Sequence, residues 1–179
     1  SMVFVMVIMA QSSAERIIEV IEEEPALKNK ENPVKEVNNG SIKFENVSFA
    51  YSDEKEEDKF ALENINIDIK EGETIGIIGG TGSSKSTLVQ LIPRLYDVTK
   101  GTIKVGGIDV KDYEIHSLRD AVAMVLQKNV LFSGTIAENL RWGKKDADEE
   151  ELQEACKLAQ ADGFIQEFPS KYDTVLDQG

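Results

Sequence analysis

The sequence predicts an α/β protein whose N-terminal part contains an antiparallel β-sheet. Residues 41–51 and 61–70 alternate apolar and polar side chains, which is the pattern of half-buried strands in a sheet with one wet face. A continuous apolar run at 73–80 then leads through a glycine-rich loop into a helical pattern at 85–97. With 179 residues, 41% of them hydrophobic and 30% charged, the chain is long enough for one globular domain with a core.

The N-terminal residues form two distinct segments. Residues 2–10 are apolar and uncharged, but they are only half of the about 20 residues that a helix needs to span a bilayer. They fit either a buried strand or the end of a longer membrane helix, and the residues alone leave both open. Ser12 followed by Glu15 is a capping signature, so we expect a helix to begin there and to stop before Pro25.

The next segment, residues 25–40, carries no periodic pattern. It contains Pro33 and Gly40, and it predicts a linker. A folded domain is therefore expected to begin near Ser41.

Two half-buried strands and one fully buried strand are expected next. The alternating apolar residues are Ile42, Phe44, Val47 and Phe49 in the first strand and Leu62, Ile65, Ile67 and Ile69 in the second. A slip in the first alternation suggests a β-bulge. The acidic run at 52–59 fits a solvated hairpin loop, with a metal or partner patch as the alternative. The unbroken apolar run at 73–80 favours a strand that is buried on both faces.

The pattern at 85–97 predicts a helix that Pro93 kinks or shortens. Its apolar face would consist of Leu88, Leu91, Ile92 and Leu95. The glycine-punctuated stretch at 101–110 predicts a hairpin.

The remaining chain is predicted to be largely helical. Residues 121–127 fit another buried strand, and residues 133–142 fit a loop that enters a short helix. Residues 147–168 read as helical, with an apolar stripe of Leu152, Ala155, Cys156 and Ala159. We therefore expect Cys156 to be a core residue rather than a reactive thiol.

Composition excludes several classes of function. A net charge of −13 argues against nucleic acid as a partner, although a small anion in a local pocket stays compatible with it. Cys156 is the only cysteine, which excludes a disulfide framework and a cysteine zinc site and fits a reducing compartment.

Residues 79–87, with the sequence GGTGSSKST, nearly match the phosphate-binding pattern Gly-x-x-x-x-Gly-Lys-Ser/Thr. In that motif backbone N–H groups bind phosphate oxygens, the lysine reaches the β- and γ-phosphates, and the hydroxyl ligates Mg²⁺. Lys85 and Ser86 stand at the required positions, but Ser84 replaces the second glycine. The alternative is a structural turn between a strand and a helix.

The consequence of Ser84 depends on its backbone conformation. A serine with negative φ loses little at this position, so that only its Cβ could intrude on the phosphates. A strained backbone would weaken phosphate binding by about 1 kcal/mol. We expect weakened binding rather than its loss.

Taken together, these segments resemble the nucleotide-binding domain of an ATP-binding-cassette (ABC) exporter of the multidrug and lipid-exporter kind. The resemblance extends over nearly the whole chain in the family's order, from GSIKFENVSFAY through the glycine-rich loop and VLQKNVLFSGTIAENL to YDTVLDQG. It implies a P-loop NTPase core of the ABC type with an N-terminal antiparallel β-subdomain, incomplete at the C-terminus.

The resemblance also implies roles for single residues. Tyr51 matches the aromatic residue that stacks on adenine, and Gln127 matches the glutamine that contacts Mg²⁺ and the attacking water. Asp177 matches an acidic residue that is thought to meet the membrane domain. The implied ATP-binding residues are Tyr51, Gly79, Gly80, Thr81, Gly82, Ser83, Ser84, Lys85, Ser86, Thr87 and Gln127, with Ser86 and Gln127 as the Mg²⁺ ligands.

Each of these residues has a simpler interpretation when it is taken alone. Tyr51 could be a core aromatic at the end of a strand, and Gln127 an ordinary polar loop residue. His116 is the only histidine, and we treat it as structural because the family's catalytic histidine lies far beyond residue 179.

The resemblance further implies a domain organisation and a setting. Residues 1–24 would be the cytoplasmic end of the last transmembrane helix, residues 25–40 the linker, and residues 41–179 the N-terminal part of the nucleotide-binding domain. The signature motif, the Walker B strand and the switch histidine would follow residue 179, so this chain would bind nucleotide at most. The expected partners are ATP, the transmembrane domain of the same chain and a second nucleotide-binding domain, at the cytoplasmic face of a membrane.

Two other functions stay open. The chain could belong to a degenerate regulatory subunit of a heterodimeric exporter, which binds ATP and hydrolyses little of it. A cassette protein without a transport function is the third alternative, and the apolar segment 2–10 counts against it. Because a strand would be missing beside residues 73–80, we also expect self-association through an open sheet edge.

Overall fold

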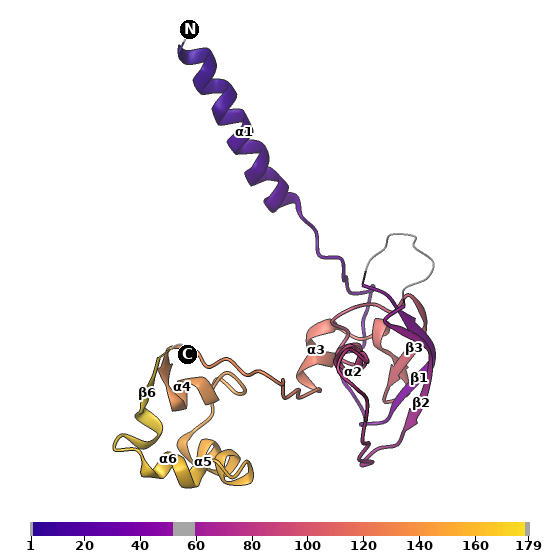
Figure 1. Cartoon of the computed structure of the whole chain (residues 1–179), viewed down its shortest axis with the longest axis vertical. Coiled ribbons are helices and arrows are strands. Elements are labelled where there is room, and N and C mark those ends of the chain that lie inside the picture. The colour runs from indigo at the N-terminus through magenta and orange to yellow at the C-terminus, as the bar shows by residue number, and fades with distance from the viewer. Residues whose placement is uncertain (1, 52–59, 178–179) are drawn as a thin grey trace. The chain divides into compact units, whose positions relative to one another are not determined.

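The computed structural model describes residues 2–51 and 60–177 (Figure 1). The acidic run at 52–59 lies outside the described residues. The chain divides into two compact units, residues 1–123 and residues 124–179, and each is described by itself.

Helix α1 (Met2–Glu22) covers the whole N-terminal segment. The alternative of a buried strand at residues 2–10 is therefore wrong, and so is a helix start at Ser12, because the helix runs through that position without a break. An uncharged apolar run is compatible with a helix and with a strand, and the segments that pack against it determine which one forms. Among the described residues, no helix is both long and apolar enough to cross a membrane.

The first unit is built on an antiparallel sheet with the order β2–β1–β3–β4. Its strands are β1 (Ile42–Phe49), β2 (Leu62–Ile69), β3 (Lys100–Val105) and β4 (Ile108–Asp109). Both predicted half-buried strands and the predicted hairpin are confirmed. The register of β1 shifts on both of its sides near Asn46, which has a φ of 48° and forms the expected bulge.

One face of this sheet packs on the helices of the first unit and forms the core. The buried core residues are Phe44, Val47, Phe49, Leu62, Leu88, Leu91, Ile103, Val105, Val110, Tyr113 and Leu118. They come from three strands, from α2 (Lys85–Gln90) and the Leu91 that follows it, from η1 (Val110–Asp112) and the Tyr113 that follows it, and from α3 (Ile115–Asp120). Burial of this apolar surface holds α2, which follows the glycine-rich loop, against the sheet.

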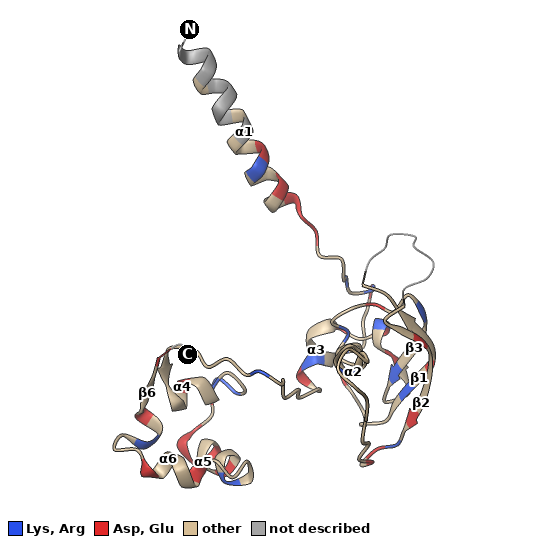
Figure 2. Ribbon diagram, viewed as in Figure 1, with Lys and Arg blue, Asp and Glu red and all other residues tan. Residues whose placement is uncertain are grey.

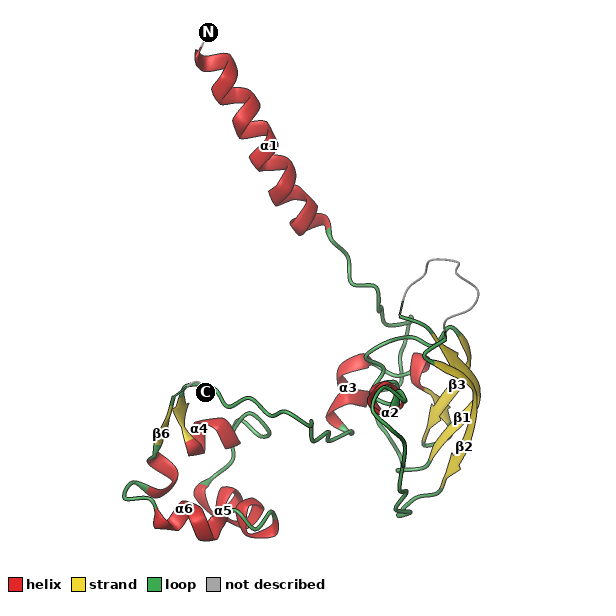
Figure 3. Cartoon of the chain, viewed as in Figure 1, coloured by secondary structure: helices red, strands yellow, loops and turns green. Residues whose placement is uncertain are grey.

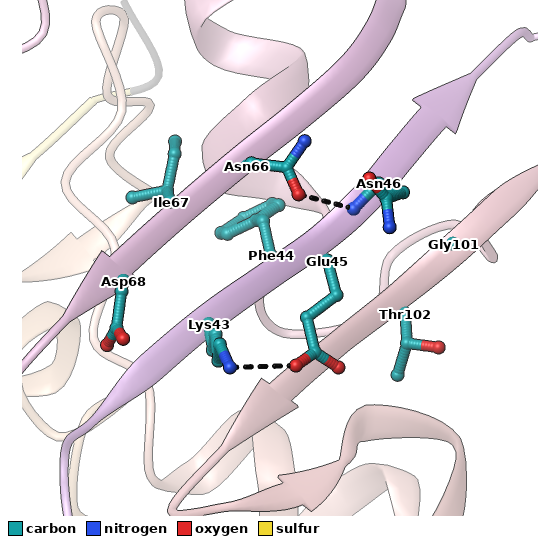
Figure 4. Close-up of a pocket in the computed structure, with 9 residues that line it drawn as sticks. All are labelled: Lys43, Phe44, Glu45, Asn46, Asn66, Ile67, Asp68, Gly101 and Thr102. Atoms are coloured by element: carbon teal, nitrogen blue, oxygen red, sulfur yellow. Dashed lines mark hydrogen bonds and ion pairs between the residues drawn. The ribbon is translucent and has the colours of Figure 1, made fainter.

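The strands also carry charged residues (Figure 2), and those of β1 and β3 form an ion cluster. The Glu45 carboxylate lies 2.8 Å from Lys43 Nζ and 2.7 Å from Lys104 Nζ. These two ammonium groups, Lys104 first, lower the pKa of Glu45 from its ordinary value of 4.5 to about 2. A depression of about 650 Å³ on the sheet is lined by Lys43, Phe44, Glu45, Asn46, Asn66, Ile67, Asp68, Gly101 and Thr102 (Figure 4). Since its central charge, on Glu45, is neutralised by two lysines, we assign no ligand to it.

Helix α2 is shorter than predicted. It ends at Gln90, before Pro93, because proline cannot supply the backbone N–H that a continuing helix needs. Leu88 and Leu91 are buried as expected, but Leu95 lies beyond the helix and is 38% exposed.

The two fully buried strands that the apolar runs predict are absent. Residues 73–80 and 122–126 have no regular secondary structure, and Figure 3 draws both stretches as loop. Ile78 is fully exposed and Val125 is 90% exposed. A strand needs a hydrogen-bonded neighbour, and neither stretch pairs with one among the described residues. Apolar composition alone does not form a strand.

The second unit consists of short elements around two small clusters of buried residues. They are β5 (Gly134–Thr135), α4 (Ile136–Leu140), α5 (Glu149–Leu158), α6 (Asp162–Glu167), η2 (Lys171–Asp173) and β6 (Val175–Leu176). The predicted short helix after residue 133 is confirmed as α4. The helical stretch at 147–168 is two helices, because the backbone turns at Gln160 with a φ of 57°.

The predicted apolar stripe of α5 is only half right. Cys156 is 2% exposed and Leu152 is 5% exposed, which confirms the core position of the cysteine. Ala155 and Ala159 are exposed, so the buried face of the helix is narrower than the sequence pattern indicates.

Candidate nucleotide-binding site

Lys85 closes the glycine-rich loop in this structure. Its Nζ donates to the carbonyl oxygens of Gly79 at 2.7 Å and Gly80 at 2.8 Å. Ser83 Oγ lies 3.1 Å from the same ammonium group. The lysine side chain, placed on α2 by the sequence, thus turns back toward the start of the loop and brings a positive charge into it.

Ser83 packs closely against Gly79. Ser83 Oγ donates to the Gly80 carbonyl at 2.8 Å, and the Ser83 amide donates to the same oxygen at 3.3 Å. A Cβ on Gly79 would lie 2.5 Å from Ser83 Oγ. A side chain at position 79 would therefore displace the Ser83 hydroxyl and disturb its bonds to Gly80 and Lys85.

Ser84 adopts the conformation that was expected to be costly. Its φ of 58° and ψ of 24° place it in the left-handed region, and its side chain caps no amide of α2. Of the two cases that the sequence left open, the strained backbone is therefore the one that applies. A residue with a Cβ is disfavoured there by about 1–2 kcal/mol, which explains why the phosphate-binding pattern asks for glycine at this position.

The start of α2 offers free backbone donors. The first bond of the helix runs from the Leu88 amide to the Ser84 carbonyl at 3.0 Å. The amides of residues 85–87 have no acceptor within the helix, as at every helix start. Together with the ammonium group of Lys85, they make the loop suited to an anion.

The two hydroxyls after Lys85 differ in their surroundings. Ser86 is exposed, so its Oγ is free to meet a ligand at the mouth of the loop. Thr87 is only 6% exposed, and its Oγ1 lies 2.8 Å from the Tyr51 hydroxyl. The bond between Thr87 and Tyr51 brings the predicted aromatic residue and the loop together across 36 positions of sequence.

Tyr51 stands in a cluster of three aromatic rings. Its ring meets Phe49 edge-on at 4.8 Å and Tyr96 edge-on at 5.3 Å between centroids. Tyr51 is 59% exposed, so the ring still offers area to a ligand, and the interpretation as a core aromatic does not describe it. Tyr96 had no role in the sequence analysis, since it follows the end of α2 and has no periodic signal.

Gln127 and Asp177 belong to the second unit, whereas Tyr51 and residues 79–87 belong to the first. Both side chains are exposed. His116 lies on α3, is exposed, and lines a cavity of the first unit. No group of three or more His, Cys, Asp or Glu side chains suited to a metal ion occurs within the described residues.

Comparison with known proteins identifies the family. Residues 62–179 match the ABC transporter family, and the chain belongs to it. A solved structure, described as a bacterial Atm1-family ABC exporter with ATP bound, superposes on 99% of this chain with a TM-score of 0.87 and 30% sequence identity. The predicted fold class, an ABC-type core with an antiparallel β-subdomain, is confirmed.

Relatives of known sequence include exporters. The chain is 46% identical over 164 residues to YgaD of Bacillus subtilis, which is provisionally named a multidrug export ATP-binding/permease protein. It is 39% identical over 173 residues to the ATP-dependent lipid A-core flippase of Desulfotalea psychrophila. These alignments cover 91% and 94% of this chain but 28% and 29% of the relatives, and 31% of the exporter in the solved structure. The chain thus spans less than a third of the length of these proteins.

Proposed function

We propose that this chain is the ATP-binding part of an ABC exporter and that it binds ATP through Tyr51 and the loop at 79–87. One observation supports this proposal most strongly. In a chain of this family, the ammonium group of Lys85 and the unpaired amides at the start of α2 meet in one glycine-rich loop. The phosphates would accept hydrogen bonds from these amides, and Lys85 would exchange its bonds to Gly79 and Gly80 for bonds to phosphate oxygens.

Tyr51 would hold the base. Its ring is exposed on one side and supported by Phe49 and Tyr96 on others, which keeps it in place without a ligand. Its bond to Thr87 fixes the distance between the aromatic ring and the loop. This arrangement supports a ligand that carries an aromatic base and phosphates.

Ser86 and Gln127 would hold Mg²⁺. Both are neutral oxygen donors, which suits a hard cation that takes its remaining ligands from phosphate and water. The ion would neutralise charge on the phosphates. Ser86 is exposed at the start of α2, directly after Lys85.

The longer protein would couple ATP binding and hydrolysis to export. The proposed partners are a transmembrane domain of the same polypeptide and a second nucleotide-binding domain, identical or different, at the cytoplasmic face of a membrane. The exporter relatives support this assignment. The 179-residue chain alone is proposed to bind nucleotide without turnover.

One observation favours a second candidate, a regulatory ATP-binding subunit with little hydrolysis of its own. Ser84 occupies a left-handed position that the phosphate-binding pattern reserves for glycine. A strained loop would hold the phosphates less well than an unstrained one. ATP turnover by the longer protein, measured with and without Ser84→Gly, separates the two candidates.

Titration of the chain with a fluorescent ATP analogue in the presence of Mg²⁺ tests the proposed function. We expect saturable binding at one site, displacement by ATP, and loss of binding in Lys85→Ala. Lys70→Ala is the matched control, because Lys70 is an exposed lysine of the same unit outside the loop. Binding that survives Lys85→Ala, or ATP turnover by this chain that depends on Lys85, would contradict the proposal.

A further inference from the structure

The turn that follows α2 contains a buried arginine. Arg94 is 4% exposed and has a left-handed backbone with a φ of 51°. Its guanidinium group donates from Nε to Asp97 Oδ1 at 2.8 Å and from Nη2 to Asp97 Oδ2 at 3.2 Å. A bidentate pair of this kind fixes the orientation of the guanidinium plane.

The same guanidinium group reaches a segment far away in sequence. Arg94 Nη2 also lies 3.4 Å from the backbone carbonyl of Lys28. Its Nη1 is buried and has no hydrogen-bond partner among the described residues. Arg119 of α3 holds the turn itself, because it donates to the carbonyls of Pro93 at 3.3 Å and Arg94 at 3.0 Å.

Residues 28–34, which we call the docked segment, are fixed to the first unit at further points. Asn29 Oδ1 accepts from the Ile115 amide at 3.0 Å. Lys30 pairs with Asp112. The Val34 amide donates to the Asp112 carbonyl at 2.8 Å, and the Glu114 amide donates to the Val34 carbonyl at 2.7 Å. The predicted linker is therefore held on η1 and α3 over much of its length.

The docked segment and the candidate nucleotide site border the same cavity. A cavity of about 790 Å³ is lined by Asn29 and its neighbours on one side and by Tyr51 and Tyr96 on another. Arg119 lines it as well. The α2 helix leads from Lys85 to Gln90 and directly into the turn that carries Arg94. The backbone of α2 and the contact of Arg94 with Lys28 thus join the loop at 79–87 to the docked segment, and Tyr51, which bonds to Thr87, lines the same cavity as Asn29.

We propose that Arg94 is a positioning residue that couples occupancy of the phosphate loop to the docked segment. A shift of α2 when the loop meets phosphate would move the Pro93–Arg94 turn, and Arg94 would pass the movement to the Lys28 carbonyl. The buried Nη1 has no partner among the described residues, so a shift of the turn that gives it an acceptor would be favoured. The inference rests on the proposed nucleotide site.

Amide hydrogen exchange on the whole 179-residue chain tests this coupling. The reporters are the amides of Val34, Glu114 and Ile115, each of which donates a hydrogen bond that joins the docked segment to residues 112–115. We expect ATP with Mg²⁺ to slow their exchange by about fivefold or more in the unaltered chain. In Arg94→Lys, which keeps the charge but not the forked geometry, this slowing should disappear while fluorescent-nucleotide binding persists.

A second variant protects the test against a loss of folding. Asn29→Ala removes an exposed side chain and two bonds of the docked segment but leaves the core intact. Without nucleotide, it should speed exchange of the Leu88 and Leu91 amides in α2 by about twofold or more. The same change on an Arg94→Lys background should leave them unaffected. A merely local structural role for Asn29 would not reach α2 in either background.

The matched control is Arg141→Lys in the second unit, where Arg141 Nε donates to the Ala147 carbonyl at 3.1 Å. It should alter neither reporter set. If the chain binds no nucleotide, the proposed function fails, and the nucleotide-free comparison of Asn29→Ala decides the coupling. If nucleotide binds but Val34, Glu114 and Ile115 exchange at unchanged rates, or Arg94→Lys retains the slowing, the coupling is wrong.

Discussion

Ser84 shows how one side chain can be compatible with a motif and still work against it. The loop at 79–87 closes with Lys85 in place, although Ser84 adopts a φ of 58°. No side-chain hydrogen bond compensates for this conformation, since Ser84 Oγ accepts from no amide of α2. The Leu88 amide donates to the Ser84 carbonyl at 3.0 Å, and Leu88 is buried, so Ser84 is tied to a helix that packs in the core.

Ser84→Gly should stabilise the first unit by about 0.5–1 kcal/mol, because relief of the left-handed strain exceeds the larger entropy that glycine loses on folding. It should also tighten nucleotide binding. Urea unfolding and fluorescent-nucleotide titration measure the two effects. The control is Ser83→Gly, since Ser83 is not among the residues with positive φ and its hydroxyl bonds within the loop. Equal stability of Ser84→Gly and the unaltered chain would mean that the serine is not strained.

Tyr51 combines two functions that substitution can separate. Tyr51→Phe removes the hydrogen bond to Thr87 and keeps the ring, so stability should fall by about 1 kcal/mol with little change in nucleotide affinity. Tyr51→Ala removes the ring as well, and affinity should fall by about tenfold or more if the base stacks there. Thermal unfolding and nucleotide titration provide the two readouts. Equal affinities of the Phe and Ala variants would rule out a base on this ring.

At the scale of elements, the sheet has an acid-sensitive ion cluster that bridges β1 and β3. The pKa of Glu45 is about 2 in the folded chain, below its ordinary value of 4.5, because Lys104 and Lys43 hold its charged form. A lowered folded pKa stabilises the protein fully above pH 4.5, and this contribution is lost as the pH falls toward about 2.

We therefore expect the urea concentration at the unfolding midpoint to decrease as the pH is lowered from 4.5 to about 2. Glu45→Gln should make this decrease smaller. The measurement is urea unfolding at several pH values, followed by tyrosine fluorescence, since three of the four tyrosines (Tyr51, Tyr96 and Tyr113) belong to the first unit. Glu63→Gln, an exposed position on β2, is the control and should keep the full pH dependence. The same acid dependence in Glu45→Gln and the unaltered chain would exclude this cluster as its source.

The sequence pattern predicted β1, β2 and the β3–β4 hairpin correctly. Each of these strands has a paired neighbour in the sheet, and such pairing turns an apolar pattern into a strand. The pattern failed at residues 73–80 and 121–127, where the same kind of apolar signal leads to no strand. Strand formation depends on a partner's backbone, and composition does not contain that information. The loop at 79–87 was predictable residue by residue, whereas the bond between Tyr51 and Thr87 required the fold.

At the scale of the whole molecule, the exposed apolar residues of the first unit suggest association between copies. Ile75 and Ile77 are each 44% exposed, and Ile78 is fully exposed. We expect concentration-dependent self-association at micromolar concentration, because contact between copies would remove this surface from water. Sedimentation velocity measures it. Ile78→Lys should weaken association. Ile67→Lys on β2 is not a suitable control, because Ile67 packs against the core.

Val20→Lys is a better control for association, since Val20 on α1 is 76% exposed and far from residues 75–78 in sequence. It should leave the sedimentation behaviour of the chain unchanged if the isoleucine segment drives association. A monomer at all concentrations would contradict the prediction. Equal effects of both lysine variants would mean that net charge, rather than this segment, controls association.

The sequence by itself determined the family, the antiparallel sheet, the positions of Lys85 and Ser86, and the burial of Cys156. The family follows from the resemblance of the motifs, and the other three follow from local spacing and side-chain chemistry, which the order of residues carries directly. Only the tertiary structure decided the left-handed backbone of Ser84 and the contacts of residues 28–34 with Arg94 and α3. The tertiary structure also showed that the two apolar runs at 73–80 and 121–127 form no strand. These features depend on which segments meet in space, and packing against distant partners is what sets them.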